Sequence, residues 1–151
     1  MIRLGYRALV SSVALLLVSA CAGTRPPEIA FLTPFGPPTN PFSPAVRVGS
    51  TLYLAGQLGT DSTGALVKGG IEAETRQTMR NIANVLSKTG SSMDRVVKCT
   101  AFLADMKEWP AMNTVYATFF PTNKPARSAF GATGLALNAR VEIECIAIVK
   151  P

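Results

Sequence analysis

The sequence has no histidine among its 151 residues and no two cysteines in a CxxC arrangement. Without histidine the chain cannot build a Ser-His-Asp triad, a Cys-His pair, an HExxH zinc site or a histidine general base. Three separate cysteines are also poorly suited to a structural zinc site or a dithiol redox centre. We therefore expect no metal and no cofactor, and the acid–base chemistry of any active site falls to carboxylates.

Clusters of like charge are also missing. The 15 Lys and Arg residues outnumber the 9 Asp and Glu residues, but two of the basic residues lie in residues 1–20. The remaining 13 basic residues are scattered singly among acids and apolar residues. This pattern favours a solvated surface over a nucleic-acid footprint, so we expect no nucleic-acid partner.

The longest apolar run near the N-terminus, residues 8–18, is too short for a comfortable membrane span. It follows two arginines and precedes small residues and Cys21, which is the arrangement of a secretory signal. Leu17-Val18-Ser19-Ala20-Cys21 also resembles a bacterial lipobox. We therefore expect residues 1–20 to be a signal peptide and Cys21 to be lipidated; the alternative is ordinary cleavage near Ala20 with Cys21 incidental. The absence of Asp at position 22 favours an outer-membrane anchor facing the periplasm.

Residues 21–39 are rich in proline and predict an extended tether before a single domain at residues 40–151. Its apolar side chains, Ile29, Phe31, Leu32 and Phe35, predict that part of it packs on the domain. Within the domain, the apolar periodicity predicts a β-β-α-β-α-β-β order. The strands are expected at residues 45–48, 51–55, 96–103, 128–131 and 141–148, and the helices at about 71–88 and 108–120.

This order indicates an α+β fold in which two helices cover one face of a mixed sheet. Glu142, Glu144, Ile146 and Ile148 alternate along the last strand, so they are expected to share the opposite, uncovered face. A face of that composition favours a homo-oligomer. In the strand at 96–103, we expect Lys98 and Thr100 on one face and Val97, Cys99 and Ala101 on the other. Cys99 and Cys145 are interpreted as buried free thiols, although export would permit a bridge.

Seven short motifs occur together in order and register over residues 40–149. They are Pro41-Phe42-Ser43-Pro44-Ala45, Leu54-Ala55-Gly56-Gln57, Glu74-Thr75-Arg76-Gln77, Val96-Val97-Lys98, Asn113-Thr114-Val115-Tyr116, Lys124-Pro125-Ala126-Arg127-Ser128 and Val141-Glu142-Ile143-Glu144. Together they resemble the RidA (YjgF, reactive intermediate deaminase) family, also called endoribonuclease L-PSP. The resemblance implies a chorismate-mutase-like fold, a homotrimer with sites in the clefts between subunits, and hydrolysis of enamines and imines of 2-amino acids to 2-oxo acids and ammonia.

The same resemblance implies the site residues. Arg127 matches the family's substrate-binding arginine, and a guanidinium suits a carboxylate because it donates two parallel hydrogen bonds. Glu144 is taken as the equivalent of the carboxylate that positions or polarises the attacking water. Asn113 matches a family asparagine near the cleft. Phe42 and Gln57 complete the expected substrate contacts, although a structural role is the stronger expectation for Gln57.

Several positions depart from active members of that family. Phe42, Ala55 and Ala129 stand where those members carry Tyr, Ser and Cys, and the spacing from Arg127 to Glu144 is two residues longer than theirs. These departures leave a second hypothesis open: a noncatalytic, lipid-anchored trimeric binder of small carboxylates. A ribonuclease has little support, because the chain lacks histidine and a lysine-rich groove.

Overall fold

The structure, a computed structural model, describes residues 26–37 and 39–149. The expected signal peptide and Cys21 lie outside the described residues. Within the described part of the chain, no helix combines the length and apolar character needed to cross a membrane.

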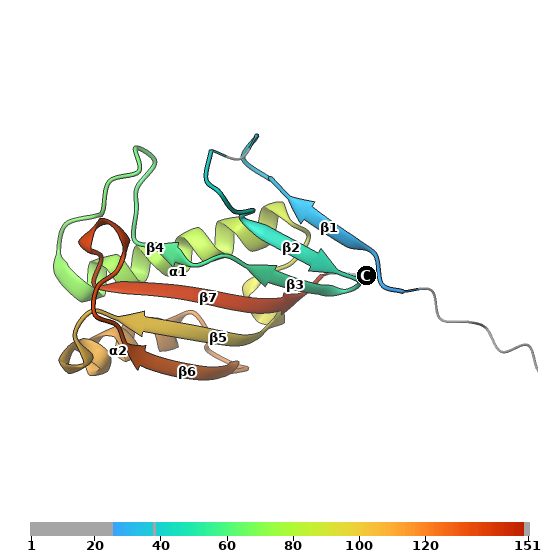
Figure 1. The fold of residues 1–151 in the computed structure, drawn as a ribbon. Coiled ribbons are helices and arrows are strands. Elements are labelled where there is room, and N and C mark those ends of the chain that lie inside the picture. The colour runs from blue at the N-terminus through green and yellow to red at the C-terminus, as the bar shows by residue number, and fades with distance from the viewer. Residues whose placement is uncertain (1–25, 38, 150–151) are drawn as a thin grey trace, which may run out of the picture.

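Seven strands form one mixed sheet with the order β1-β2-β3-β7-β5-β6, and β4 pairs with β7 beside β3 (Figure 1). β5 and β6 run parallel, and the other paired strands of the described residues run antiparallel. The bounds are β1 Ile29–Leu32, β2 Ala45–Val48, β3 Thr51–Leu54, β4 Gln57–Leu58, β5 Val96–Leu103, β6 Ala126–Gly131 and β7 Val141–Ile148.

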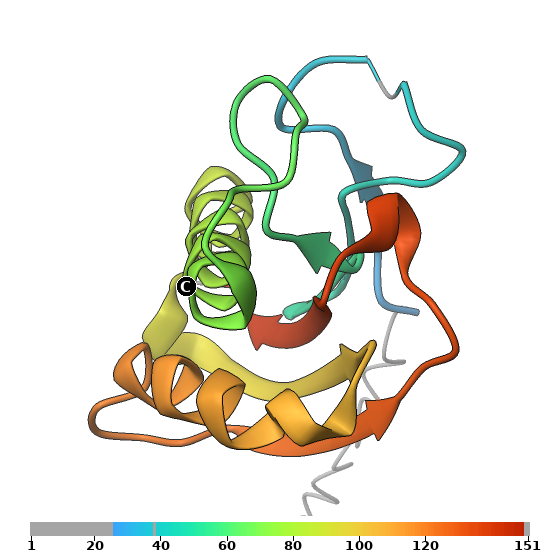
Figure 2. The same cartoon turned by 90° about the vertical axis from the view of Figure 1, so that its left-hand side faces the viewer.

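Both helices, α1 (Gly70–Lys88) and α2 (Trp109–Thr118), pack on the same side of this curved sheet (Figure 2). The chain turns into α1 through Gly69 and Gly70, whose positive φ angles of 118° and 75° strongly favour glycine. The predicted apolar stripe of α1 is confirmed, since its members are all buried: Ile71, Thr75, Thr78, Ile82, Val85 and Leu86. We call the side of the sheet that the helices cover the helix face.

α2 begins one residue later than predicted. Asp105 accepts a hydrogen bond from the Lys107 amide at 2.9 Å and starts a single 3₁₀ turn, Met106–Glu108. The helix proper follows with Pro110 in its first turn, where a missing amide hydrogen costs nothing. It buries Met112, Val115 and Tyr116 against the sheet.

β7 alternates as the sequence predicts. Val141, Ile143, Cys145 and Ala147 are buried on the helix face, and the residues between them are exposed or half-buried. Glu142, Glu144, Ile146 and Ile148 therefore share the other side of the sheet, which we call the open face. The register carries this face across the neighbouring strands, because Ile146 pairs with Tyr53, Tyr53 with Val46 and Val46 with Phe31.

Two local predictions are wrong. Ile29–Leu32, in the segment interpreted as a tether, form strand β1 on the edge of the sheet. The strand pairs with β2 through its backbone, and Leu32 packs against the core, as expected for part of this segment. The side chains of Ile29 and Phe31 remain 59% and 72% exposed. In β5, a bulge between Val96 and Lys98 shifts the register. It turns Val97 outward, so Val97 does not share the buried face of Cys99 and Ala101.

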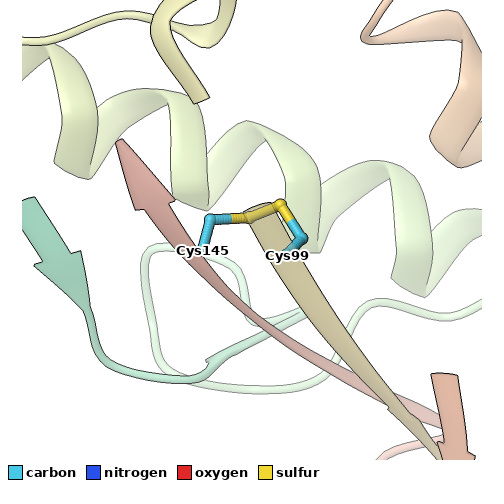
Figure 3. The surroundings of a disulfide bond; sticks show 2 residues. All are labelled: Cys99 and Cys145. Carbon is cyan, nitrogen blue, oxygen red and sulfur yellow. A yellow bond between two sulfur atoms is a disulfide. The ribbon is translucent and has the colours of Figure 1, made fainter. Parts of the chain in front are cut away.

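The interpretation of Cys99 and Cys145 as free thiols is also wrong, because the two form a disulfide bond. They lie directly opposite each other in the antiparallel pairing of β5 and β7, with their Cα atoms 4.1 Å apart. Figure 3 shows the bond on the side of the strands that faces α1. It therefore ties the neighbouring strands β5 and β7 together from within the core.

Candidate functional site

Arg127 lies on the edge strand β6, where it is aligned with Cys99 of β5. Its guanidinium reaches three side chains of α2, spaced so that they lie along one side of that helix. Nη2 of Arg127 donates to Oδ1 of Asn113 at 2.7 Å. The guanidinium carbon lies 4.5 Å from the ring centroid of Tyr116 and 5.7 Å from that of Trp109. The helix therefore holds the cation by one hydrogen bond and two aromatic rings.

No acidic side chain of residues 26–37 and 39–149 forms an ion pair with Arg127. The two ion pairs between described residues are Arg47–Glu28 and Arg140–Glu108, and Arg127 takes part in neither. Its bond to Asn113 uses one of its five N–H groups. The half-buried guanidinium opens on a cavity of about 290 Å³. A fixed, unpaired cation beside a cavity is suited to binding a carboxylate.

Tyr116 forms part of the floor of that cavity. Burial raises the pKa of its phenol to about 12, and the nearby Arg127 opposes the rise. Its Oη has no hydrogen-bond partner among the described residues. At neutral pH the ring therefore supports the guanidinium as a neutral aromatic surface, without offering a counter-charge.

The open face carries the carboxylates. Glu142 pairs with Leu58 of β4 and with Phe102 of β5. Its pKa is raised, first by burial and second by the negative charge of Glu144. A Cβ atom at position 56 would overlap the Glu142 carboxylate. Because residue 56 is glycine, this carboxylate can lie against the backbone of Gly56. Of the two carboxylates on this face, Glu142 has the partly buried surroundings and raised pKa that are typical of an acid–base group.

Glu144, the carboxylate expected at the site, is more exposed than Glu142. It pairs with Thr100 of β5 and lines a shallow cavity of about 170 Å³ with Tyr53 and Lys98. Sequence reasoning assigned no role to Glu142, although one signal pointed to it. The spacing from Arg127 to Glu144 exceeds the family's by two residues, and Glu142 stands two residues earlier.

Within one chain, the sheet separates Arg127 from both glutamates. Arg127 is aligned with Cys99, whose side chain is buried on the helix face. Glu142 and Glu144 are aligned with Phe102 and Thr100, which point to the open face. The structure therefore brings Arg127 and Asn113 together but leaves the carboxylates on the other side of the sheet.

The remaining candidates lie away from the cavity beside Arg127. Nε2 of Gln57 donates to the backbone oxygens of Ala55 and Gly56, at 3.1 and 3.2 Å. The amide hydrogen bonding expected of Gln57 is thus present, and a contact with substrate stays a prediction. Phe42 is 52% exposed in the segment before β2. Among the described residues, no group of three or more Cys, Asp and Glu side chains is placed to hold a metal ion.

Comparisons with known proteins agree with this architecture. The model of the family described as endoribonuclease L-PSP matches residues 35–149. A 2-iminobutanoate/2-iminopropanoate deaminase of Mus musculus is 42% identical over 113 residues, which cover 74% of this chain and 84% of the mouse protein. The crystal structure of YEO7 of yeast superimposes with a TM-score of 0.76 at 36% identity, covering 82% of this chain and all of the yeast chain. TdcF of E. coli, crystallised with bound serine, gives a TM-score of 0.71 at 26% identity, covering 80% and 98% of the two chains.

Proposed function

Because this chain belongs to the RidA family, the family described as endoribonuclease L-PSP, we propose that it hydrolyses 2-imino acids to 2-oxo acids and ammonia. Its relatives of about 40% identity include 2-iminobutanoate/2-iminopropanoate deaminases of mammals and of a mite. The single observation that carries the proposal is the unpaired guanidinium of Arg127, held by Asn113 and Tyr116 at the edge of the sheet.

The reaction needs a carboxylate clamp and a group that moves a proton. In the proposed mechanism Arg127 binds the substrate carboxylate through two hydrogen bonds and so fixes the adjacent C=N carbon. Glu142 accepts a proton from a water molecule as the water oxygen bonds to the carbon of the protonated imine and the C=N π electrons move to nitrogen, which gives a neutral carbinolamine. Glu142 returns that proton to the amino nitrogen. The C–N bond then breaks and releases ammonia, while the hydroxyl gives its proton to the Glu142 carboxylate and leaves the 2-oxo acid.

The proposal includes a homotrimer in which Arg127 of one subunit faces Glu142 of another. It is supported by the separation of these side chains across the sheet and by the apolar residues on the open face, such as Phe31 and Tyr53. Mixing Arg127→Ala and Glu142→Gln chains tests it. Co-refolded mixtures should regain activity that neither variant has alone, because some clefts then hold two intact halves. No gain over the separate variants would contradict a shared site.

We also propose that the protein is exported and carries a lipid on Cys21. The disulfide between Cys99 and Cys145 supports export, because such bonds persist in oxidising compartments. A Cys21→Ser variant should fold and lose its membrane association. A Cys21→Ser protein that still sediments with membranes after a high-salt wash would contradict the anchor.

The decisive experiment for the activity measures ammonia release from 2-iminopropanoate that an amino-acid oxidase generates in the same vessel. The deaminase should accelerate release above the uncatalysed rate, and Arg127→Ala should remove the acceleration. The missing hydroxyls at positions 42 and 55 favour the second candidate, a noncatalytic binder of small carboxylates. In that case 2-oxo acids bind wild type at Arg127 while ammonia release stays at the uncatalysed rate.

A further inference from the structure

The cavity beside Arg127 contains a second cation. Besides Arg127, its charged lining residue is Lys124, two positions before the start of β6. The rest of the lining is neutral, with Asn113 as its polar side chain and Tyr116, Phe120 and Pro125 among its apolar ones. Two positive charges therefore share about 290 Å³ without an acidic residue in the lining.

One carboxylate does not balance the two positive charges that this chain itself places in the cavity lining. Neither of the ion pairs between described residues includes Lys124 or Arg127. A 2-imino acid with a short apolar side chain offers a single carboxylate, and Arg127 is better shaped to bind it because its planar fork donates two hydrogen bonds. The ammonium of Lys124 is a point charge on a flexible stem, and it is left without a partner. The lining is therefore electrostatically complementary to a ligand with a second negative group.

The spacing of the two cations suits a short ligand. Lys124 and Arg127 are three residues apart, so their Cα atoms are separated by at most about 11 Å even in a fully extended chain. Both residues line the same cavity, and Lys124 is exposed there. Tyr116 and Phe120 add apolar surface to the same lining, which suits the one or two methylene groups of such a ligand.

We propose that Lys124 selects ligands with a second carboxylate, so that the preferred substrates of this site are 2-imino acids derived from four- and five-carbon dicarboxylic amino acids. The inference rests on the proposed function in so far as it concerns substrates. The selectivity itself is a property of binding and does not require catalysis. Arg127 takes the carboxylate next to the reacting carbon, and Lys124 takes the distal one.

Binding of stable 2-oxo acids tests the selectivity without turnover. Calorimetry compares 2-oxoglutarate with 2-oxobutyrate on wild type, Lys124→Gln and Lys107→Gln. Lys107 is an exposed lysine outside the lining of this cavity, so its variant is a matched control for loss of one positive charge. Wild type and Lys107→Gln should bind 2-oxoglutarate about 3- to 10-fold more tightly than 2-oxobutyrate. This range corresponds to a solvent-accessible charge pair with a charge-assisted hydrogen bond between Lys124 and the distal carboxylate.

Lys124→Gln should lose that preference and retain binding of 2-oxobutyrate, and the wild-type preference should shrink as salt is added. Arg127→Ala should weaken both ligands, which places them in this cavity. Equal affinities of wild type for the two acids, or an unchanged preference in Lys124→Gln, would overturn the proposal. Measuring ammonia release as well separates this proposal from the proposed function. Selective binding without catalysis would refute the deaminase activity alone. Catalysis without a preference for dicarboxylates would refute the role of Lys124 alone.

Discussion

On the helix face of the sheet, Arg127 is held by a hydrogen bond from its guanidinium to Asn113 and by the rings of Tyr116 and Trp109. On the open face, Glu142 accepts no hydrogen bond from the described residues and is half-buried beside a second carboxylate. One charge is thus oriented by its own chain, whereas the other is desolvated without compensation. In the proposed homotrimer, a single chain therefore orients the carboxylate-binding residues of the site, and the acid–base residue meets them only across a subunit boundary.

The largest expected effect tests which carboxylate performs the chemistry. Glu142→Gln should lower the rate of imine hydrolysis by about 10²–10⁴, because glutamine keeps the size of the side chain but cannot accept the proton. Glu144→Gln is the matched control and should lower the rate far less, since Glu144 is more exposed. Ammonia release under saturating substrate measures both. The reverse order of effects would return the role to Glu144, as the sequence alone suggested.

The disulfide connects the strand next to Arg127 with the strand that carries both glutamates. Cys99 and Cys145 are separated by 46 residues, and closing a loop of that length stabilises the folded state by about 4 kcal/mol in the chain-entropy model. A Cys99→Ala, Cys145→Ala double variant should lose free energy of unfolding on that order, as measured by urea denaturation. Reductant should destabilise wild type similarly and leave the variant unchanged. A wild type insensitive to reductant would argue that the bond adds no stability.

Arg127→Ala tests the oriented half directly. Removing a charge-assisted, bidentate contact should weaken binding of 2-oxo acids by about 10- to 150-fold, corresponding to roughly 1.5–3 kcal/mol. Arg47→Ala is the control, since Arg47 is half-exposed and pairs loosely with Glu28 at 3.9 Å. Calorimetry on both variants measures the change. Wild-type affinity in Arg127→Ala would remove this residue from the site.

The sequence predicts elements whose signal is periodic and local. The buried stripe of α1 and the alternation of β7 were both predictable, because the 3.6-residue and two-residue periods record which side of each element is buried. The position of Arg127 beside Asn113 was also recoverable, but through the motifs of the resemblance and not through periodicity.

What the sequence did not predict depends on register between distant segments. The backbone pairing of Ile29–Leu32, the bulge at Val97 and the disulfide all require knowledge of which residues lie opposite each other in the sheet. The choice between Glu142 and Glu144 as the acid–base residue also depends on which distant residues lie beside each carboxylate. Both share one face by alternation, and they differ in burial and in the close approach of Gly56 to Glu142, neither of which alternation predicts.

The smallest expected effect tests whether Arg127 of one subunit lies close to Glu142 of another. The raised pKa of Glu142 means that the native state holds this proton more tightly than the unfolded chain. Its contribution to stability is therefore present below the ordinary pKa of 4.5 and is lost as the pH rises through the higher native value. Glu142→Gln should remove this loss, so the variant should be more stable than wild type at pH 7, by about 0.5 kcal/mol for a half-exposed charge.

An Arg127→Ala background sharpens this measurement. If Arg127 of a neighbouring subunit faces Glu142, its positive charge offsets the cost of the carboxylate in the assembled protein. Glu142→Gln should then stabilise the Arg127→Ala protein more than it stabilises wild type, and the difference is the coupling energy of a double-mutant cycle. Urea denaturation of the four proteins at pH 7 and at successively lower pH supplies the cycle, and the coupling should shrink as the carboxylate takes up its proton. Additive effects at pH 7 would show that the guanidinium and the carboxylate do not approach each other, and the comparison between the two faces would then describe two separate sites.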